Sequence, residues 1–569
     1  MNDIRRTILW VIFGFSMVLL WDQWQIYNGH KPTFFPTPPK VEAGAPVAGG
    51  TSAPASANNG VPTAAPVAGQ VSAVPGSAQA AGAAPREQID IRTDVLRLRF
   101  DTEGGSLVRT EFLQHDDAHR KGEHVVLLDE SKERVYLAQT GLIASAAGGN
   151  FPTHKTVMRA LPGERTLKDG QDSLTLQFES PAVDGVKLLK TYTLQRGSYA
   201  IGVKHEVLNR GSAAVSPQLY LQLLRDGNKP AGESSFYSTF TGPAIYTEAK
   251  KYHKVEFSDI EKNKAEIDKT SNNGYVAMVQ HYFASAWLLG EGIERENFVR
   301  KVDNNLYAVG MITPLGDVAP GQSKVLENQL FVGPQEEKKL EALAPGLELL
   351  KDYGWLAMLA KPLYWLLDQL FKVIQNWGWS IMALVLLLKI AFYWLNAKAY
   401  ASMAKMKAIN PRIMEMRARL KDNPQQMQME MMKIYREEKV NPMGGCFPML
   451  VQIPVFIALY WVLLSSVEMR HAPWVGWIVD LSAPDPYFIL PIFMTLTTLL
   501  QTALNPAPPD PMQAKMMWLM PLVFSVMFFF FPAGLVLYWI TNNVLSIVQQ
   551  WIINTRMGVP PQFNLPKFK

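Results

Sequence analysis

One basic residue interrupts a long apolar stretch. Residues 376–395 read NWGWSIMALVLLLKIAFYWL, and Lys389 is the only charged residue among them. About 20 apolar residues suffice to cross a bilayer core of roughly 30 Å. A charge inside such a helix costs at least ~2.5–3.5 kcal/mol, and it usually faces a bundle interior or a wet cavity. Lys389 either reaches the nearby headgroups or attracts an anionic group inside the protein.

Polar side chains also recur in other apolar stretches. In residues 535–553 they follow a helical spacing of i, i+4, i+8 and i+11, on one face: Tyr538, Asn542, Ser546 and Gln549. Gln452 and Gln501 lie near the ends of two further stretches. These groups need partners or water. They form either hydrogen bonds between helices or a wet, positively charged groove around Lys389.

Composition indicates a membrane protein with one large water-exposed insert. The 569 residues are 48% hydrophobic, and the apolar residues concentrate in the first 20 and the last 220 or so positions. A net charge of +5 is too small to indicate nucleic-acid binding. The single cysteine, Cys446, excludes a disulfide within the chain and a cysteine zinc site. There is no phosphate-binding G-x-x-x-x-G-K-[ST] loop, and we predict no cofactor or metal.

The first 85 residues predict an anchor and a tether. Arg5 and Arg6 precede an apolar run, and no small-residue cleavage site follows it, so residues 1–27 are predicted to be an uncleaved transmembrane anchor with the arginines in the cytoplasm. Residues 28–85 are rich in Pro, Ala and Gly. They predict a flexible linker, because such a sequence buries too little surface to fold.

Residues 86–335 predict an all-β sandwich outside the membrane, in the periplasm. Short alternating runs such as SLTLQFE at 173–179 are separated by turn signals such as Gly104-Gly105. No catalytic constellation stands out by spacing, which favours a binding or scaffold domain over an enzyme. Residues 336–376 predict connecting helices. One of them carries Asp368, Gln369 and Lys372 on one face, as expected for a helix in the membrane interface or, alternatively, a packed buried helix.

Residues 399–441 predict a cytoplasmic helical hairpin. They contain nine Lys or Arg against five Asp or Glu, and Asn423-Pro424 matches the start of a second helix. Its many methionines suit either a surface for apolar partners or ordinary packing. The basic residues expected to act there are Lys405, Lys407, Arg412, Arg417 and Arg419.

The C-terminal region predicts five membrane spans, at about 377–398, 446–466, 487–504, 515–531 and 535–553. With the anchor they make six transmembrane helices, and both termini lie in the cytoplasm. The membrane core therefore covers residues 377–554, and a short cytoplasmic tail covers residues 555–569. The predicted fold class is a multi-domain membrane protein with an α-helical polytopic domain and an all-β periplasmic sandwich.

Four motifs closely resemble the YidC membrane protein insertases, whose relatives are the Oxa and Albino proteins. They are NPMGGCFPMLVQIPVFIALYWVL (441–463), SMAKMKAINPRI (402–413), DPMQAKMM (510–517) and FPAGLVLYWITNN (531–543). The resemblance spans residues 353–554. The anchor, linker and β domain resemble the Gram-negative type, whose periplasmic domain is a β-supersandwich.

The resemblance implies insertion and folding of newly made inner-membrane proteins, alone or with the Sec translocon, without enzymatic activity. It places a basic residue of the second span, usually arginine and here Lys389, in a hydrophilic inner-leaflet groove. Lysine keeps the charge but lacks the planar fork of arginine. The groove residues expected from the spacing and the resemblance together are Lys389, Gln452, Gln501, Tyr538, Trp539, Asn542 and Ser546.

The resemblance also implies the partners. They are nascent membrane proteins, the Sec translocon and membrane lipids, with no direct recognition of nucleic acid. The cytoplasmic hairpin resembles the loop that receives substrate. Ribosome contact through the tail is expected to be weak, because residues 555–569 are short, proline-containing and only weakly basic. Two alternatives remain, an anion transporter, which would predict repeats or broken helices, and a membrane-anchored periplasmic enzyme.

Overall fold

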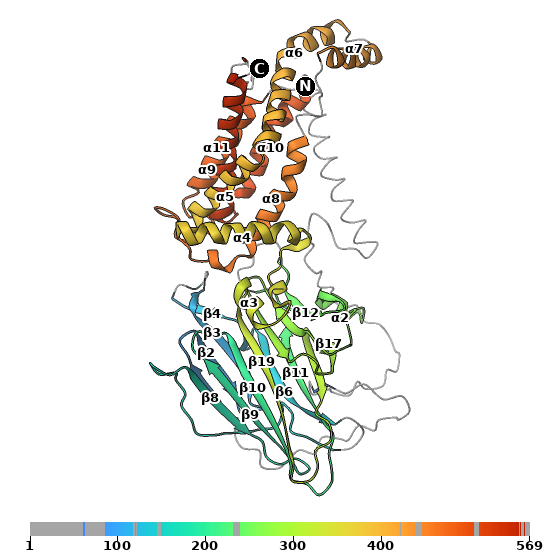
Figure 1. Cartoon of the computed structure of the whole chain (residues 1–569), viewed down its shortest axis with the longest axis vertical. Helices are drawn as coiled ribbons and strands as arrows, with labels where there is room; N and C mark the ends of the chain where they lie inside the picture. The colour runs from blue at the N-terminus through green and yellow to red at the C-terminus, as the bar shows by residue number, and fades with distance from the viewer. Residues whose placement is uncertain are drawn as a thin grey trace, which may run out of the picture. The chain divides into compact units, whose positions relative to one another are not determined.

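The computed structural model describes residues 61–62, 86–117, 120, 122–144, 149–230, 239–420, 423–438, 447–505, 511–556, 558 and 563. The predicted anchor (1–27), almost all of the linker (28–85) and most of the tail lie outside the described residues. The chain divides into two compact units. Gly49–Lys351 holds the strands, and the part from Asp352 onward holds the long helices. Figure 1 colours the strands from blue to yellow-green and the long helices from yellow to red.

The strands form two antiparallel sheets. The ten-stranded sheet runs in the order β1-β2-β3-β6-β11-β18-β17-β14, with β4 beside β3 and β5 beside β6. Its strands are β1 (Gln88–Arg92), β2 (Leu96–Asp101), β3 (Ser106–Asp116), β4 (His124–Val126), β5 (Asp129–Glu130), β6 (Val135–Ala144), β11 (Pro217–Asp226), β14 (Thr270–Ser271), β17 (Arg295–Asp303) and β18 (Leu306–Pro314).

The nine-stranded sheet runs in the order β13-β12-β15-β16-β19-β10-β9-β8-β7. Its strands are β7 (Arg159–Ala160), β8 (Ser173–Glu179), β9 (Val186–Gln195), β10 (Ala200–Asn209), β12 (Gly242–Thr247), β13 (Lys251–Lys254), β15 (Tyr275–Val279), β16 (Phe283–Leu289) and β19 (Ser323–Pro334). Two short helices, α2 (Phe257–Glu261) and α3 (Glu337–Leu343), complete this unit.

Alternation in the sequence produces the burial seen in the sheets. In β8, Leu174, Leu176 and Phe178 are buried, and the residues between them are more exposed. The two sheets pack face to face. One contact between them joins Trp287 Nε1 on β16, the donor, to the backbone oxygen of Gln222 on β11 at 3.1 Å. The predicted all-β fold of this region is therefore confirmed.

The space between the sheets also holds a lysine and a histidine, whose burial was not predicted from the sequence. Lys190 is fully buried and donates to the carbonyl oxygens of Gly104 (2.6 Å) and Thr140 (2.8 Å). His205, also fully buried, contacts Thr140 Oγ1 at 2.9 Å and Asn328 Nδ2 at 3.1 Å. Burial lowers the pKa of Lys190 to about 7 and the pKa of His205 well below its usual value.

A second buried histidine lies elsewhere in the same unit. His154 Nδ1 lies 2.6 Å from the Tyr220 hydroxyl, and burial lowers its pKa to about 3. A histidine with a depressed pKa in the folded state stabilises the fold above the unfolded pKa of about 6.5, and this stability is lost as the pH falls towards the folded pKa. His154 and His205 therefore both oppose folding in acid.

We expect the β domain to lose stability between pH 6.5 and 5, by up to about 1.4 kcal/mol per pH unit for each buried histidine. Lys190 does not contribute in this window, since its protonation differs between the folded and unfolded states only from about pH 7 upward. Urea unfolding of the separately expressed domain at several pH values measures the slope. His205→Gln reduces the slope, and His124→Gln, on a short outer strand, is the matched control. Equal slopes in all three proteins would contradict the assignment.

The second unit is a bundle of helices. Its helices are α4 (Ala357–Ile374), α5 (Trp377–Ala391), α6 (Tyr393–Arg419), α7 (Pro424–Glu437), α8 (Phe447–Ser465), α9 (Ile489–Leu504), α10 (Pro511–Phe528) and α11 (Ala533–Arg556). α11 packs against both α5 and α9, at the centre of the bundle. Figure 1 shows α4 lying crosswise at one end of the long helices, and α6 and α7 extending at the other end.

Local sequence explains where two of these helices begin. The Asn376 side chain accepts from Trp379 N at 3.1 Å and donates to the Trp474 carbonyl at 3.1 Å, so it caps α5 and fixes the loop before α9. Gly378 is required beside it, because a Cβ atom there would collide with the Trp474 ring. At α7, Asn423 accepts from Gln426 N at 3.2 Å and Pro424 is the first helical residue, as predicted.

α5 and α6 are separated by a bend of 68° at Phe392. The sequence predicted one continuous span over 377–398. None of the described helices is by itself both long and apolar enough to cross a bilayer, but α5 and α6 up to Met406 meet this requirement as a bent pair. α4 buries Ala360, Tyr364 and Leu367 and exposes Met358, Trp365 and Val373. Its position in a membrane interface remains a prediction.

Candidate functional site

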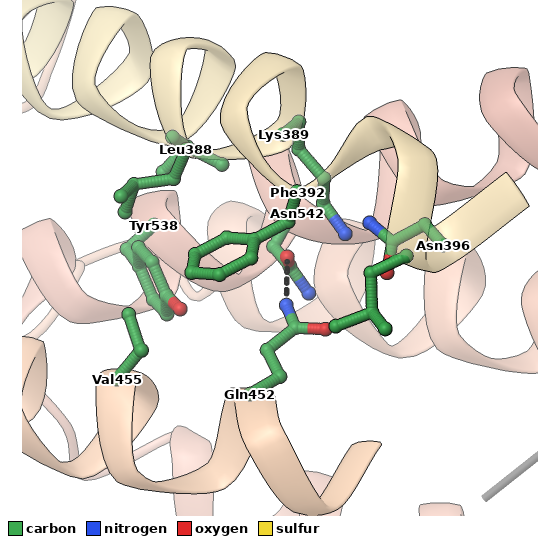
Figure 2. Close-up of a pocket in the computed structure, with 10 residues that line it drawn as sticks. Leu388, Lys389, Phe392, Asn396, Gln452, Val455, Tyr538 and Asn542 are labelled. Atoms are coloured by element: carbon green, nitrogen blue, oxygen red, sulfur yellow. Dashed lines mark hydrogen bonds between the residues drawn. The ribbon is translucent and has the colours of Figure 1, made fainter. Parts of the chain in front are cut away.

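A small cavity opens where α5, α6, α8 and α11 meet. Its volume is about 30 Å³, enough for one or two water molecules. Figure 2 shows Lys389, Asn396, Gln452 and Asn542 pointing toward one another, with Tyr538, Val455 and Leu388 at the other side of the cavity. Its lining residues are Val385, Leu388, Lys389, Phe392, Leu395, Asn396, Gln452, Val455, Tyr538 and Asn542.

Lys389 is buried in the last turn of α5, with 6% of its surface exposed. Its Nζ donates to Ser546 Oγ on α11 at 2.7 Å, and Ser546 Oγ donates in turn to the Asn542 carbonyl at 2.7 Å. Among the described residues, no Asp or Glu lies within 4 Å of this ammonium group. The C-terminal end of a helix carries partial negative charge and favours a cation, so the bend after α5 helps to hold an otherwise uncompensated charge.

Amide side chains complete the polar wall. Gln452 Nε2 on α8 donates to Asn542 Oδ1 on α11 at 3.0 Å (Figure 2). Gln549 Nε2 donates to the Lys389 carbonyl at 3.3 Å, and Asn396 Nδ2 donates to Gln549 Oε1 at 3.4 Å. Gln549 thereby satisfies a carbonyl that the helix break leaves without a partner in its own helix. The polar face of α11 thus both contacts the lysine and stabilises the bend that positions it.

Aromatic residues form the opposite wall. Tyr538 is buried, and the Phe456 ring lies 5.7 Å from it and 4.6 Å from Trp539, centroid to centroid. Trp539 also packs edge-on against Phe528 at 4.8 Å, so its indole belongs to the packing between helices and it does not line the cavity. The structure therefore brings Lys389, Gln452, Tyr538 and Asn542 to the cavity, with Ser546 bonded to the lysine behind them.

Gln501 is half-buried on α9 and is not among the cavity-lining residues. The sequence analysis, in turn, did not single out Asn396 and Phe392, which do line the cavity. Phe392 is three residues and Asn396 seven residues after Lys389, a spacing that would put them near one face of a straight helix, but the bend at Phe392 decides where their side chains lie.

The hairpin uses several of its basic residues to join its own helices. Arg412 on α6 bonds Glu438 at 2.8 Å and Glu437 at 3.1 Å, and Arg419 bonds Glu430 at 2.7 Å. Arg417 is half-buried, with Nη2 at 4.0 Å from Met431 Sδ. Lys405 is exposed on α6, and Lys407 lies in the same helix. Of the predicted hairpin set, Lys405, Arg412 and Arg419 are exposed, and the two arginines also bond the neighbouring helix segment.

The predicted methionine surface divides into two parts. Met406, Met416, Met427 and Met431 pack around Ile409, Ile413 and Ile434 between α6 and α7. Met414, Met429 and Met432 are exposed. The hairpin thus has packed methionines, as ordinary packing requires, and exposed methionines, as a surface for apolar partners requires.

In the part of the chain that the structure describes, no group of three or more His, Cys, Asp or Glu side chains is arranged to hold a metal ion.

Comparison with known proteins decides the family. Residues 88–366 match the YidC periplasmic domain, and residues 369–559 match the 60Kd inner membrane protein family. A curated membrane protein insertase YidC of Cupriavidus necator is 54% identical over 98% of both chains, and one of Cupriavidus taiwanensis is 55% identical over 98% of both chains. The chain belongs to the YidC membrane protein insertase family.

The YidC family is a family of insertases and not of enzymes, and its members combine an inner-membrane part with a periplasmic domain. A solved structure described as an active YidC insertase with its first transmembrane domain resolved is 18% identical to this chain. The match covers 81% of this chain and 91% of the solved chain, with a TM-score of 0.36. The YidC membership is carried by the sequence matches.

Two adjacent asparagines lie on different polar faces of α11, so the contribution of each face to stability can be tested by a separate substitution. Asn543 donates to Thr498 Oγ1 at 2.8 Å and to Thr497 Oγ1 at 3.3 Å, in the packed contact with α9. Asn542 faces the cavity instead. We expect Asn543→Ala to lower the free energy of unfolding by about 0.5–2 kcal/mol. We expect Asn542→Ala to cost less, since water can enter the cavity and satisfy Gln452. Detergent-to-SDS unfolding titrations measure both, and equal losses would contradict this division.

Proposed function

We propose that this chain inserts and folds newly made inner-membrane proteins through a hydrophilic, positively charged groove in the inner leaflet, both without the Sec translocon and together with it. The observation that carries the proposal is Lys389. It is a buried cation without a carboxylate within 4 Å among the described residues, and it faces a cavity lined by Asn396, Gln452 and Asn542. The relatives of this chain are named membrane protein insertases, which supports the same function.

The proposed topology has six membrane spans. The first is the anchor at 1–27, and the others correspond to α5 with the start of α6, α8, α9, α10 and α11. The positive-inside rule supports a cytoplasmic hairpin and cytoplasmic termini, and it leaves the β domain in the periplasm. α4, with Met358, Trp365 and Val373 exposed beside its polar positions, then lies in the periplasmic interface.

The proposed mechanism lowers the cost of moving polar groups into the membrane. An acidic or polar segment of an incoming chain loses its hydration when it enters hydrocarbon. A cavity with one cation and several amides offsets part of that loss and shortens the apolar path. The apolar segment of the substrate then leaves sideways into lipid, driven by burial of its own surface. No covalent step and no nucleotide is involved.

The present cavity is too small for a peptide segment, so substrate entry requires α5, α8 and α11 to separate. Such opening breaks the Lys389–Ser546 and Gln452–Asn542 hydrogen bonds. The groups that satisfy one another in the closed form become available to a substrate in the open form. Each broken pair is worth only about 0.6 kcal/mol between membrane helices on average, so these two hydrogen bonds add little to the cost of opening.

The hairpin is the proposed first contact for substrate on the cytoplasmic side. Exposed Met414, Met429 and Met432 offer a flexible apolar surface for varied hydrophobic segments. The proposed partners are nascent membrane proteins, the Sec translocon and membrane lipids. The ribosome is included as a weak contact only, because residues 555–569 carry few basic residues.

Charge at position 389 is expected to matter most for acidic substrates. We predict that Lys389→Met lowers insertion of a substrate with an acidic translocated segment by about tenfold, equivalent to ~1.4 kcal/mol. Lys389→Arg, which keeps the charge, retains most of the activity. The matched substrate has Asn and Gln in place of Asp and Glu. Protease protection of the translocated segment is the measurement. An equal loss for both substrates in Lys389→Met would rule out attraction of acidic groups.

A crosslinking experiment tests the path itself. A photoreactive residue at position 538, on the cavity wall, is expected to crosslink a ribosome-bound nascent membrane protein while its apolar segment emerges. Val544, which is 38% exposed on another face of α11, is the matched control position. Crosslinks at 538 that depend on nascent-chain length support the groove. Equal labelling at 538 and 544, or none at 538, would leave the polar face of α11 as a packing device.

A further inference from the structure

Two residues of the predicted linker contact the β domain. Val61 packs against a cluster formed by Ile143, Tyr220 and Ile312, beside Phe298. Pro62 is buried. Both residues lie in the same compact unit as the two sheets. This part of the sequence was predicted to be a linker throughout, so the contact is a finding of the structure.

The contact lies on the outer face of the ten-stranded sheet. Thr140 on β6 bonds His205 of the other sheet, so it faces inward. Its neighbour Gly141 therefore faces outward, because successive residues of a strand point to opposite faces. Gly141 pairs with Tyr220 on β11, and Tyr220 pairs with Ile312 on β18. The cluster that receives Val61 thus spans neighbouring central strands of the sheet.

Arg300 on β17 recognises the backbone of the docked segment. Its Nη1 donates to the Val61 carbonyl at 3.0 Å, and its Nη2 donates to Gln222 Oε1 at 3.3 Å. Gln222 is fully buried and donates to Gln139 Oε1 at 2.9 Å. The guanidinium lies 5.5 Å from the centre of the Phe298 ring. Side chains from β6, β11 and β17 therefore hold the arginine in place to donate to a backbone carbonyl oxygen.

The sequence Val-Pro suits such a site. Proline has no N–H group, so burying Pro62 leaves no backbone donor without a partner. The residue before a proline is restricted to extended conformations, which presents the Val61 side chain and carbonyl in a fixed relation. Arg300 satisfies that carbonyl, and the Ile143, Tyr220 and Ile312 cluster receives the apolar side chains. Little conformational freedom remains to be lost on docking.

We propose that the outer face of the ten-stranded sheet is a binding site for a valine–proline segment, and that Val61–Pro62 of the same chain is its occupant. The linker is then attached to the domain at this point. The inference concerns the β domain and does not rest on the proposed insertase function.

The linker offers its own matched control. Val-Pro occurs a second time, at Val74–Pro75, which lies outside the described residues. Val74 is nearer than Val61 to the first strand along the chain. Random collisions would therefore bring position 74 to the sheet at least as often as position 61, since effective concentration falls with the length of the connecting chain. Specific docking of Val61–Pro62 would instead bring position 61 to the sheet more often than position 74.

Disulfide trapping in the full-length chain tests the proposal. In a Cys446→Ser background, Ile312→Cys is combined with Val61→Cys or with Val74→Cys. Trypsin cuts after Lys40 and Arg86, so both linker positions lie in one peptide, residues 41–86. The two variants therefore give disulfide-linked peptides of equal mass, and mass spectrometry can compare their amounts directly. We expect the pair with position 61 to oxidise at least about tenfold faster than the pair with position 74. Phe298→Cys in place of Ile312→Cys provides a second acceptor position if Ile312→Cys impairs folding.

Adding Arg300→Met tests the recognition of the carbonyl. This change keeps an apolar stem and removes the donor, and we expect the rate for position 61 to fall about fivefold and that for position 74 to stay constant. Equal trapping rates at 61 and 74 would overturn the docking site. An unchanged rate at 61 in Arg300→Met would overturn the role of the arginine.

Discussion

An uncompensated positive charge inside an apolar helix bundle is the constraint on which the membrane-type unit depends. Lys389 donates a hydrogen bond to Ser546 Oγ and lies at the favourable C-terminal end of α5, but it has no carboxylate within 4 Å among the described residues. The bend at Phe392 creates that helix end, and Gln549 satisfies the carbonyl that the bend exposes. The polar face of α11 therefore performs two tasks, since it solvates the cation and holds the backbone that presents it.

The β domain meets a similar constraint by different means. Lys190 is fully buried between the sheets, where two backbone carbonyls accept from it, and its pKa falls to about 7. Both hydrogen-bond acceptors of Lys190 are backbone carbonyls of the same domain. Lys389, by contrast, borders a space that can admit water. One buried lysine is thus bonded only within its own domain, and the other borders a cavity.

Much of this architecture could be predicted from sequence patterns. Alternation in segments such as β8, the Asn423-Pro424 helix start, and the shared face of Tyr538, Asn542 and Ser546 all follow from local periodicity. Lys190 was not predicted, because a lysine in an alternating strand is assigned to the solvent side, and its burial depends on two carbonyls far away in sequence. Asn396 was missed because the bend at Phe392 has no proline to signal it. Gln501 shares the depth of the cavity residues but lies on α9, and depth alone does not specify the facing helix.

The bend has a mechanical consequence. α6 continues from Phe392 into the hairpin, and its first part, up to Asn410 before Pro411, is about 27 Å long at 1.5 Å per residue. A rigid rod of that length moves its far end by about 5 Å when it tilts by about 10° at the bend. Force applied to the hairpin is thus delivered as a rotation next to Lys389 and Asn396.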